Sequence, residues 1–123
     1  MILVDTSVWI EHLRRGSPDL QRLLLAERVL THPFVVGEVA CGSIRNRSAI
    51  LALLANLPQI AAAEHNEVLS LLDEARLHGR GLGWVDANLL CSGLFAKRRL
   101  WTLDRRLRTI SWRLGVAYAP VSR

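Results

Sequence analysis

The stretch MILVDTSVWIEHLRR, residues 1–15, decides the fold of this chain. MILV is apolar but too short for a helix, which predicts a buried first strand ending at Asp5. The following residues, Thr6 to Arg15, predict a helix that Gly16 stops. A buried strand running directly into a helix is the first unit of an alternating α/β domain.

The rest of the chain repeats this alternation. Further short apolar runs predict strands at 29–31, 100–103 and 116–119. Apolar spacing and helix-boundary residues predict helices starting at Ser17-Pro18-Asp19 and over 34–43, 48–57, 64–78 and 86–97, with one more after Asp104. The GRGLG stretch, residues 79–83, predicts a turn or flexible loop. The expected fold is an α/β domain with a mostly parallel sheet between helical layers.

Length and composition favour one water-soluble domain. A chain of 123 residues is within the usual size of a single domain, so we expect one domain over residues 1–123. A hydrophobic content of 50% and a mean hydropathy of +0.20 exclude disorder, and the apolar runs are too short to span a bilayer. MILV also lacks the basic residues that begin a signal peptide, which predicts a cytoplasmic protein.

The net charge of +5 is concentrated near the end of the sequence. Residues 97–123 hold eight basic residues and one acid, whereas residues 1–96 hold eight arginines and ten acids. A local basic stretch is the electrostatic footprint of a nucleic-acid binder, and it is equally compatible with a solvated helix face. Arg105, Arg106 and Arg108 lie in this stretch and are the side chains predicted to contact nucleic-acid phosphates.

Acidic residues follow two of the predicted strands. Asp5 follows MILV and Asp104 follows 100–103, while Asp86 comes after the glycine-rich loop and Glu38 lies between Gly37 and Gly42. Taken singly, each aspartate is explained as a helix cap and Glu38 as a surface residue. Taken together they predict a cluster, because the carboxyl ends of parallel strands meet at one edge of the sheet.

Several carboxylates within a few ångströms of one another would need a cation to remain ionised. Oxygen-only ligands select hard ions, so the expected cofactor is Mg²⁺ or Mn²⁺. The implied chemistry is hydrolysis of a phosphodiester by metal-activated water, which requires no serine, cysteine or histidine nucleophile.

Four stretches carry a family resemblance. They are DTSVWIEHL (5–13), VVGEVACG (35–42), GLGWVDANLL (81–90) and LWTLDRRL (100–107). In order and spacing they resemble the four acidic motifs of PIN-domain ribonucleases, most closely the VapC-type toxins of bacterial toxin–antitoxin pairs. The resemblance spans nearly the whole chain and implies a PIN-like, three-layer α/β/α fold.

The resemblance also implies roles for individual residues. Asp5, Glu38, Asp86 and Asp104 would be the catalytic, metal-binding acids, and Thr6, Ser7 and Thr102 would support them. Leu107 departs from the aromatic residue common at the end of the fourth motif, which concerns packing more than chemistry. The implied partners are an RNA of the tRNA or ribosomal class and a VapB-like antitoxin that silences the enzyme.

Two other functions compete with a metal-dependent endoribonuclease. The basic stretch alone would serve a non-catalytic nucleic-acid-binding module. Four tryptophans, Trp9, Trp84, Trp101 and Trp112, would suit a dimerising scaffold if one core cannot hide them all. A homodimer is compatible with the enzyme as well, and we expect one.

Overall fold

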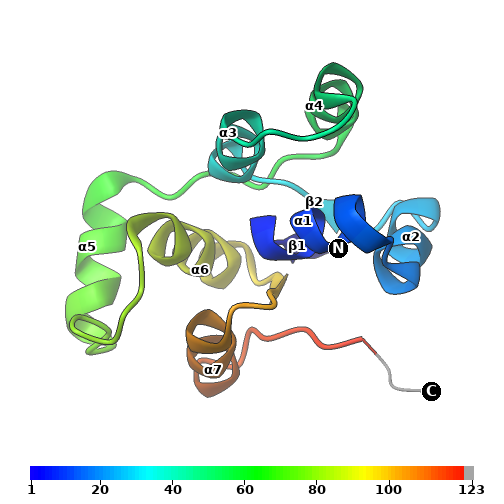
Figure 1. The fold of residues 1–123 in the computed structure, drawn as a ribbon. Helices are drawn as coiled ribbons and strands as arrows, with labels where there is room; N and C mark the ends of the chain where they lie inside the picture. The colour runs from blue at the N-terminus through cyan, green and yellow to red at the C-terminus, as the bar shows by residue number, and fades with distance from the viewer. Residues whose placement is uncertain (121–123) are drawn as a thin grey trace.

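A short parallel sheet forms the centre of the computed structural model, which describes residues 1–120 (Figure 1). Strand β1, Ile2–Val4, lies between β2, Val29–Leu30, and β3, Arg99–Trp101. Ile2 is in register with both Val29 and Arg99, and both pairings are parallel. The predicted strands at MILV and 29–31 are confirmed, and β3 begins and ends slightly before its predicted range.

Two helices follow β1 as the sequence predicts. Helix α1 spans Thr6–Arg15 and helix α2 spans Pro18–Leu25. The Ser17 hydroxyl accepts a hydrogen bond from the Leu20 backbone N–H at 3.2 Å, and Pro18 occupies the first turn, where it removes no helical hydrogen bond. The start of α2 is therefore set by its cap and its proline.

The middle of the chain is helical. Helices α3, α4 and α5 span Pro33–Cys41, Arg47–Asn56 and His65–Glu74. The segment between α4 and α5 returns to the sheet edge, where Thr31 forms a parallel bridge with Gln59. Figure 1 shows α5 and α6 on one side of the strands and α2 on the other, in agreement with the expected layered α/β fold.

Two predictions for the last third of the chain need correction. Helix α6 spans Trp84–Ala96, so Asp86 lies within its first turn instead of beginning it. The stretch 116–119 contributes only an isolated bridge between Ala117 and Leu100, so the sheet of the described residues has three strands. Helix α7, Arg105–Arg113, follows Asp104 as predicted. The last three residues of the expected domain, 121–123, lie outside the described residues.

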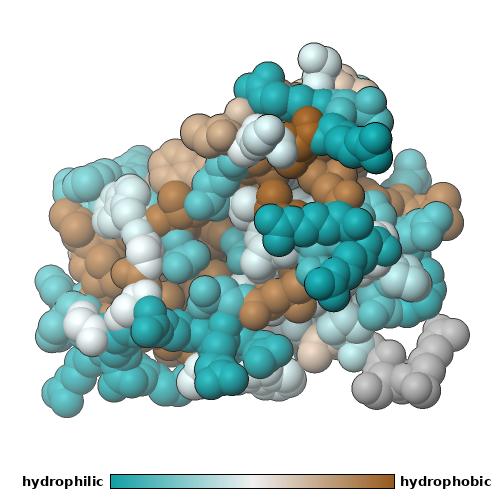
Figure 2. Space-filling view, in the orientation of Figure 1, coloured by the Kyte–Doolittle hydropathy of each residue, from teal (hydrophilic) through white to brown (hydrophobic). Residues whose placement is uncertain are grey.

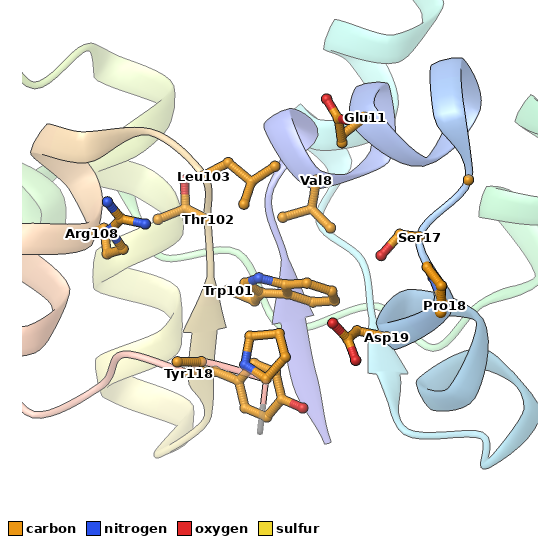
Figure 3. Close-up of a pocket in the computed structure, with 13 residues that line it drawn as sticks. Val8, Glu11, Ser17, Pro18, Asp19, Trp101, Thr102, Leu103, Arg108 and Tyr118 are labelled. Atoms are coloured by element: carbon orange, nitrogen blue, oxygen red, sulfur yellow. The ribbon is translucent and has the colours of Figure 1, made fainter. Parts of the chain in front are cut away.

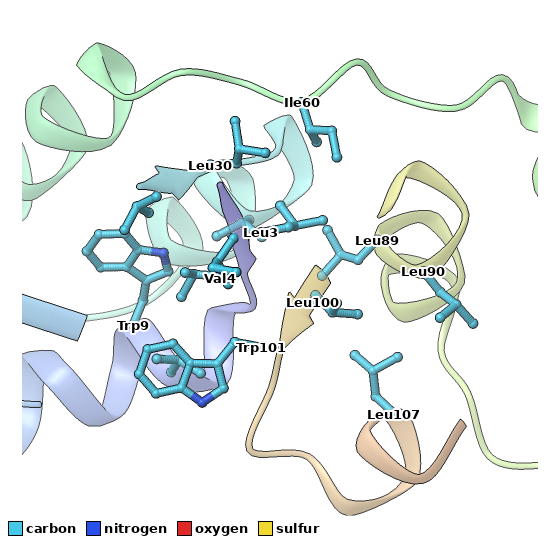
Figure 4. Close-up of a cluster of buried hydrophobic side chains, with 14 of the residues drawn as sticks. Leu3, Val4, Trp9, Leu30, Ile60, Leu89, Leu90, Leu100, Trp101 and Leu107 are labelled. Carbon is cyan, nitrogen blue, oxygen red and sulfur yellow. The ribbon is translucent and has the colours of Figure 1, made fainter. Parts of the chain in front are cut away.

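Apolar side chains from the sheet and from helices on both sides of it form the core (Figure 4). Leu3 and Val4 of β1 are fully buried, as are Leu89 and Leu90 of α6. Strand β1 therefore has no polar face, as expected for a strand covered by helices on both sides. The core fixes β1, and thereby the position of Asp5 at its end.

The tryptophans divide into two pairs. Trp9 and Trp101 are buried, whereas Trp84 and Trp112 are 40% and 59% exposed. Brown, apolar side chains reach the surface over α5 and α6 in Figure 2, where Leu69 and Phe95 are also exposed. Over residues 1–120, no helix is both long and apolar enough to cross a membrane.

Truncation of the central strand should cost substantial stability. Leu3→Ala leaves a cavity in the core and should lower the free energy of unfolding by about 2–5 kcal/mol in urea denaturation. Leu25→Ala is the matched control, because Leu25 is 80% exposed and its truncation should change stability by less than about 0.5 kcal/mol. Equal losses in the two variants would contradict the assignment of β1 to the core.

Candidate active site

Asp5 is the buried carboxylate at the carboxyl end of β1, with only 5% of its surface exposed. Its Oδ2 accepts hydrogen bonds from the hydroxyls of Ser7 and Thr102, both at 2.7 Å. Asp5 occupies the N-cap position of α1, yet its side chain makes no capping hydrogen bond. The carboxylate is therefore held by two hydroxyls, and capping does not explain it.

Thr102 connects Asp5 to Asp104. Its hydroxyl donates to Asp5 and accepts a hydrogen bond from the Asp104 backbone N–H at 3.1 Å. Asp104 lies three residues beyond the end of β3, not directly after the strand as predicted. Its Oδ1 accepts from the Leu107 backbone N–H at 3.0 Å, so Asp104 does cap α7. Its exposed carboxylate retains acceptor capacity at the other oxygen.

Glu38 reaches the same region from α3. The Thr6 hydroxyl donates a hydrogen bond to Glu38 Oε1 at 2.6 Å, across 32 positions of sequence. Thr6 is the first residue of α1 and directly follows Asp5. The two hydroxyl residues after Asp5 thus bind different acids: Thr6 binds Glu38, and Ser7 binds Asp5.

The charges of the other three acids affect the pKa of Asp86. Its carboxylate accepts a hydrogen bond from the Gly83 backbone N–H at 3.2 Å, in the first turn of α6. Burial raises the pKa of Asp86, the Gly83 hydrogen bond opposes that shift, and the negative charges of Asp5, Asp104 and Glu38 raise the pKa further. Asp5, Asp104 and Glu38 are therefore all close enough to Asp86 to disfavour its ionised form.

The cluster has no cation of its own. In residues 1–120, the ion pairs are Arg15 with Glu11 and Arg22 with Asp19, and neither includes one of the four acids. No three acid, histidine or cysteine side chains of the described chain are close enough together to form a ready-made metal cage. The expectation of acids within a few ångströms of one another is thus met only in part. The other three acids influence the pKa of Asp86, but the four carboxylates are not arranged as ligands of one ion. An all-oxygen donor set with a buried, cation-free aspartate nevertheless suits a hard divalent ion.

A groove of about 310 Å³ begins at Thr102, the residue that binds Asp5. Its lining includes Glu11 and Asp19, each of which pairs with an arginine, and none of the four candidate acids. Thr102, Leu103 and Trp101 line it from β3 and the turn that follows, and Arg108 borders it from α7 (Figure 3). Tyr118 closes the end nearer the start of the strands. Exposed Leu103 gives the groove an apolar wall next to Asp104.

The three predicted RNA-binding arginines are exposed on α7. Arg106 packs against the backbone of the glycine-rich loop, where a β-carbon at Gly81 would approach its Cδ to 2.8 Å. Arg108 borders the groove that begins at Thr102. Gly81 also has a φ of 81°, a conformation that other residues rarely adopt, so the loop needs glycine there.

Sequence reasoning missed a buried polar network that positions α3. His32 is fully buried, and its Nδ1 accepts a hydrogen bond from the Phe34 backbone N–H at 3.0 Å. Its Nε2 lies 3.3 Å from the Ser92 hydroxyl, which accepts from the Ala63 backbone N–H. Burial lowers the pKa of His32, which favours the neutral ring that can cap α3. A histidine directly before a helix-starting proline was the available signal.

The sheet, the acids and the motif order together define a PIN domain. The family model described as "PIN domain" matches residues 2–113, and the chain belongs to this family. Within the family it is similar to Ribonuclease VapC32 of Mycobacterium tuberculosis, in the strains CDC 1551 / Oshkosh and H37Rv. Each relative is 53% identical over 120 residues, which is 97% of this chain and 97% of the relative. The predicted likeness to VapC-type PIN proteins is confirmed.

Neutralising Asp86 should stabilise the protein in the absence of metal. A carboxyl whose pKa is raised by folding favours the folded state below its unfolded pKa, and this contribution is lost as pH rises through the folded pKa. We therefore expect Asp86→Asn to melt at a higher temperature than the parent at pH 7 in chelator. The difference in melting temperature should shrink toward pH 4, because the parent's Asp86 carboxyl then becomes protonated.

Asp73→Asn, on the exposed surface of α5, is the matched control and should show no such pH-dependent gap. A parent protein that is more stable than Asp86→Asn at pH 7 would show that the Asp86 carboxylate is a structural cap.

Proposed function

We propose that this chain is a metal-dependent endoribonuclease that acts as the toxin of a toxin–antitoxin pair. The observation that carries the proposal is the gathering of four carboxylates: burial raises the pKa of Asp86, and the negative charges of Asp5, Asp104 and Glu38 raise it further. Near-full-length similarity to proteins named Ribonuclease VapC32 supports RNA as the substrate class.

Asp5, Glu38, Asp86 and Asp104 would hold Mg²⁺ or Mn²⁺. When bound, the ion supplies an activated water and positive charge for phosphodiester hydrolysis. The protein contributes orientation: Ser7 and Thr102 fix the Asp5 carboxylate, and Thr6 fixes Glu38. Hydroxyls that orient ligands in this way typically affect metal affinity or activity by about 10- to 100-fold.

Arg105, Arg106 and Arg108 would contact phosphates of the RNA. All three are exposed, and Arg108 borders the groove that begins at Thr102. A guanidinium suits phosphate because it donates two parallel hydrogen bonds. Transfer RNA or ribosomal RNA is the proposed substrate class, and the cytoplasm, where both are made, is the proposed location.

A VapB-like antitoxin is the proposed protein partner. A basic side chain placed among the four acids would balance the charge that a metal otherwise balances, and would thereby exclude metal and RNA together. Apolar side chains on the same partner would cover exposed surface of the toxin and supply much of the affinity.

We also propose a homodimer. Trp84, Phe95 and Trp112 each leave much of a large apolar side chain in water, and a partner chain that covered them would remove that area from solvent. These exposed side chains also suit the alternative of a dimerising scaffold, but that function gives no reason for four carboxylates that pair with no cation in the described residues.

Cleavage should require a divalent ion. We expect purified protein to cut RNA with Mg²⁺ or Mn²⁺ and to stop in EDTA, and Asp5→Asn to lose activity by roughly 100-fold or more while Asp73→Asn retains it. Gel analysis of end-labelled RNA measures both. Undiminished cleavage by Asp5→Asn, or by the parent in chelator, would refute the mechanism.

Expression of the chain alone should arrest bacterial growth, and co-expression with a short open reading frame adjacent to its gene should restore growth. Asp5→Asn should be harmless without a partner, because it retains the fold and loses the activity. Normal growth on strong expression of soluble, metal-replete parent protein would argue against a toxin and leave a housekeeping nuclease.

A further inference from the structure

The amino ends of the strands carry a second charged site, opposite in sign to the acids. Arg28, Lys97, Arg98 and Arg99, which we call the basic cluster, line a cavity of about 250 Å³. All four are exposed, and no carboxylate lines the cavity in the described part of the chain. None of the four forms an ion pair within residues 1–120.

The fold itself brings these residues together. The Arg28 carbonyl accepts a hydrogen bond from the Ile2 N–H at 2.8 Å, and Arg99 is in register with Ile2 from the other side. Arg98 follows the left-handed turn at Lys97, which ends α6, and its N–H donates to the Gly93 carbonyl at 2.9 Å. Since neighbouring strands lie about 4.8 Å apart, the backbones of Arg28 and Arg99 flank β1 at roughly 10 Å from each other.

Clustered cations without a counterion repel one another, so this arrangement favours an anion. The cavity is smaller than the roughly 300 Å³ at which pockets for whole small molecules begin. It therefore suits phosphate groups that rest on the surface better than an enclosed nucleotide. Guanidinium groups bind such phosphates through paired hydrogen bonds.

Tyr118 lies between the basic cluster and the groove that begins at Thr102. Its side chain lines both the 250 Å³ cavity and the groove that begins at Thr102. In Figure 3, Thr102 lies beyond the tip of the strand and Tyr118 lies back toward its start, with Trp101 between them. The Tyr118 ring meets Trp101 edge to face, with ring centroids 5.6 Å apart. A three-residue strand spans only about 10 Å, so a few nucleotides could cover this path.

We infer that the basic cluster is a second phosphate-binding site, which holds the backbone of single-stranded RNA that runs from the acids along the groove and past Tyr118. This inference rests on the proposed function and extends it, because it gives the enzyme a preference for RNA with an unpaired flank. Tyr118 is half-buried at this surface, and a ring that a base can stack on beside phosphate-binding cations is typical of single-strand binding.

The test measures RNA binding as a function of salt. The variant Arg28→Ala/Arg98→Ala is made in an Asp5→Asn background, which keeps the RNA intact. The matched control, Arg14→Ala/Arg45→Ala in the same background, removes equal charge from exposed positions elsewhere. Thermal melting verifies that each protein is folded, and Arg28→Gln/Arg98→Gln repeats the test should the alanine pair unfold.

The two variants should differ in salt dependence. With a fluorescent 12-nucleotide single-stranded RNA, loss of two phosphate contacts should reduce the slope of log affinity against log salt by about 1.4, or about 0.7 for each contact. The control pair should leave the slope unchanged. Equal slopes in the two variants would overturn the inference.

Two further arms identify the anion. Pyrophosphate at constant ionic strength should displace RNA from the parent only weakly, and duplex DNA should show no difference between the variants. Tight displacement by pyrophosphate, or a difference confined to duplex DNA, would overturn the assignment to RNA. In active protein, the Arg28/Arg98 pair should raise KM for the 12-nucleotide RNA and leave kcat unchanged. Absence of any cleavage by the parent would refute the proposed function alone, because the binding slopes are measured without catalysis.

Discussion

The half-buried carboxylate of Asp86, held in the field of three other acids, is the interaction on which the rest of this account depends. Burial and three neighbouring negative charges all disfavour its ionised form. The fold tolerates the cluster because hydroxyl and backbone donors stabilise the individual carboxylates: Ser7 and Thr102 at Asp5, Thr6 at Glu38. A site that is costly when empty gains most from binding a cation, which links the stability of the domain to its proposed chemistry.

The shortness of the sheet gives the molecule two charged ends. Acids gather where the strands end, and Arg28, Lys97, Arg98 and Arg99 surround the points where they begin. Both ends depend on β1, whose buried leucine and valine anchor it between the helical layers. In the proposed function, the basic end attracts the RNA and the acidic end cleaves it once a metal ion has reversed the charge there.

Local patterns predicted the elements well. MILV was too short for anything but a strand, and Ser17 with Pro18 set the start of α2. The stretch 116–119 was mistaken for a strand because its apolar residues pack and bridge without forming a ladder, a distinction that only tertiary contacts make.

The motifs single out the four acids as candidates, whereas the hydrogen-bonding partners that the structure gives these acids could not be predicted. No local rule predicts that Thr6 reaches Glu38 across 32 positions, or that the exposed arginines at 98 and 99 join Arg28. The sequence also could not show which aspartate caps its helix: Asp104 does, and Asp5 does not. These outcomes depend on the packing of segments that are distant in sequence.

The central claim is that the four carboxylates form one site whose repulsion a divalent ion relieves. Its most direct measurement is the melting temperature of the parent protein and of Asp5→Asn as Mn²⁺ is added at pH 7. An ion that binds only the folded state raises stability in proportion to the logarithm of its concentration once the site is saturated. The account predicts this rise for the parent and its loss in Asp5→Asn. Equal responses of the two proteins, or no response in the parent, would contradict it.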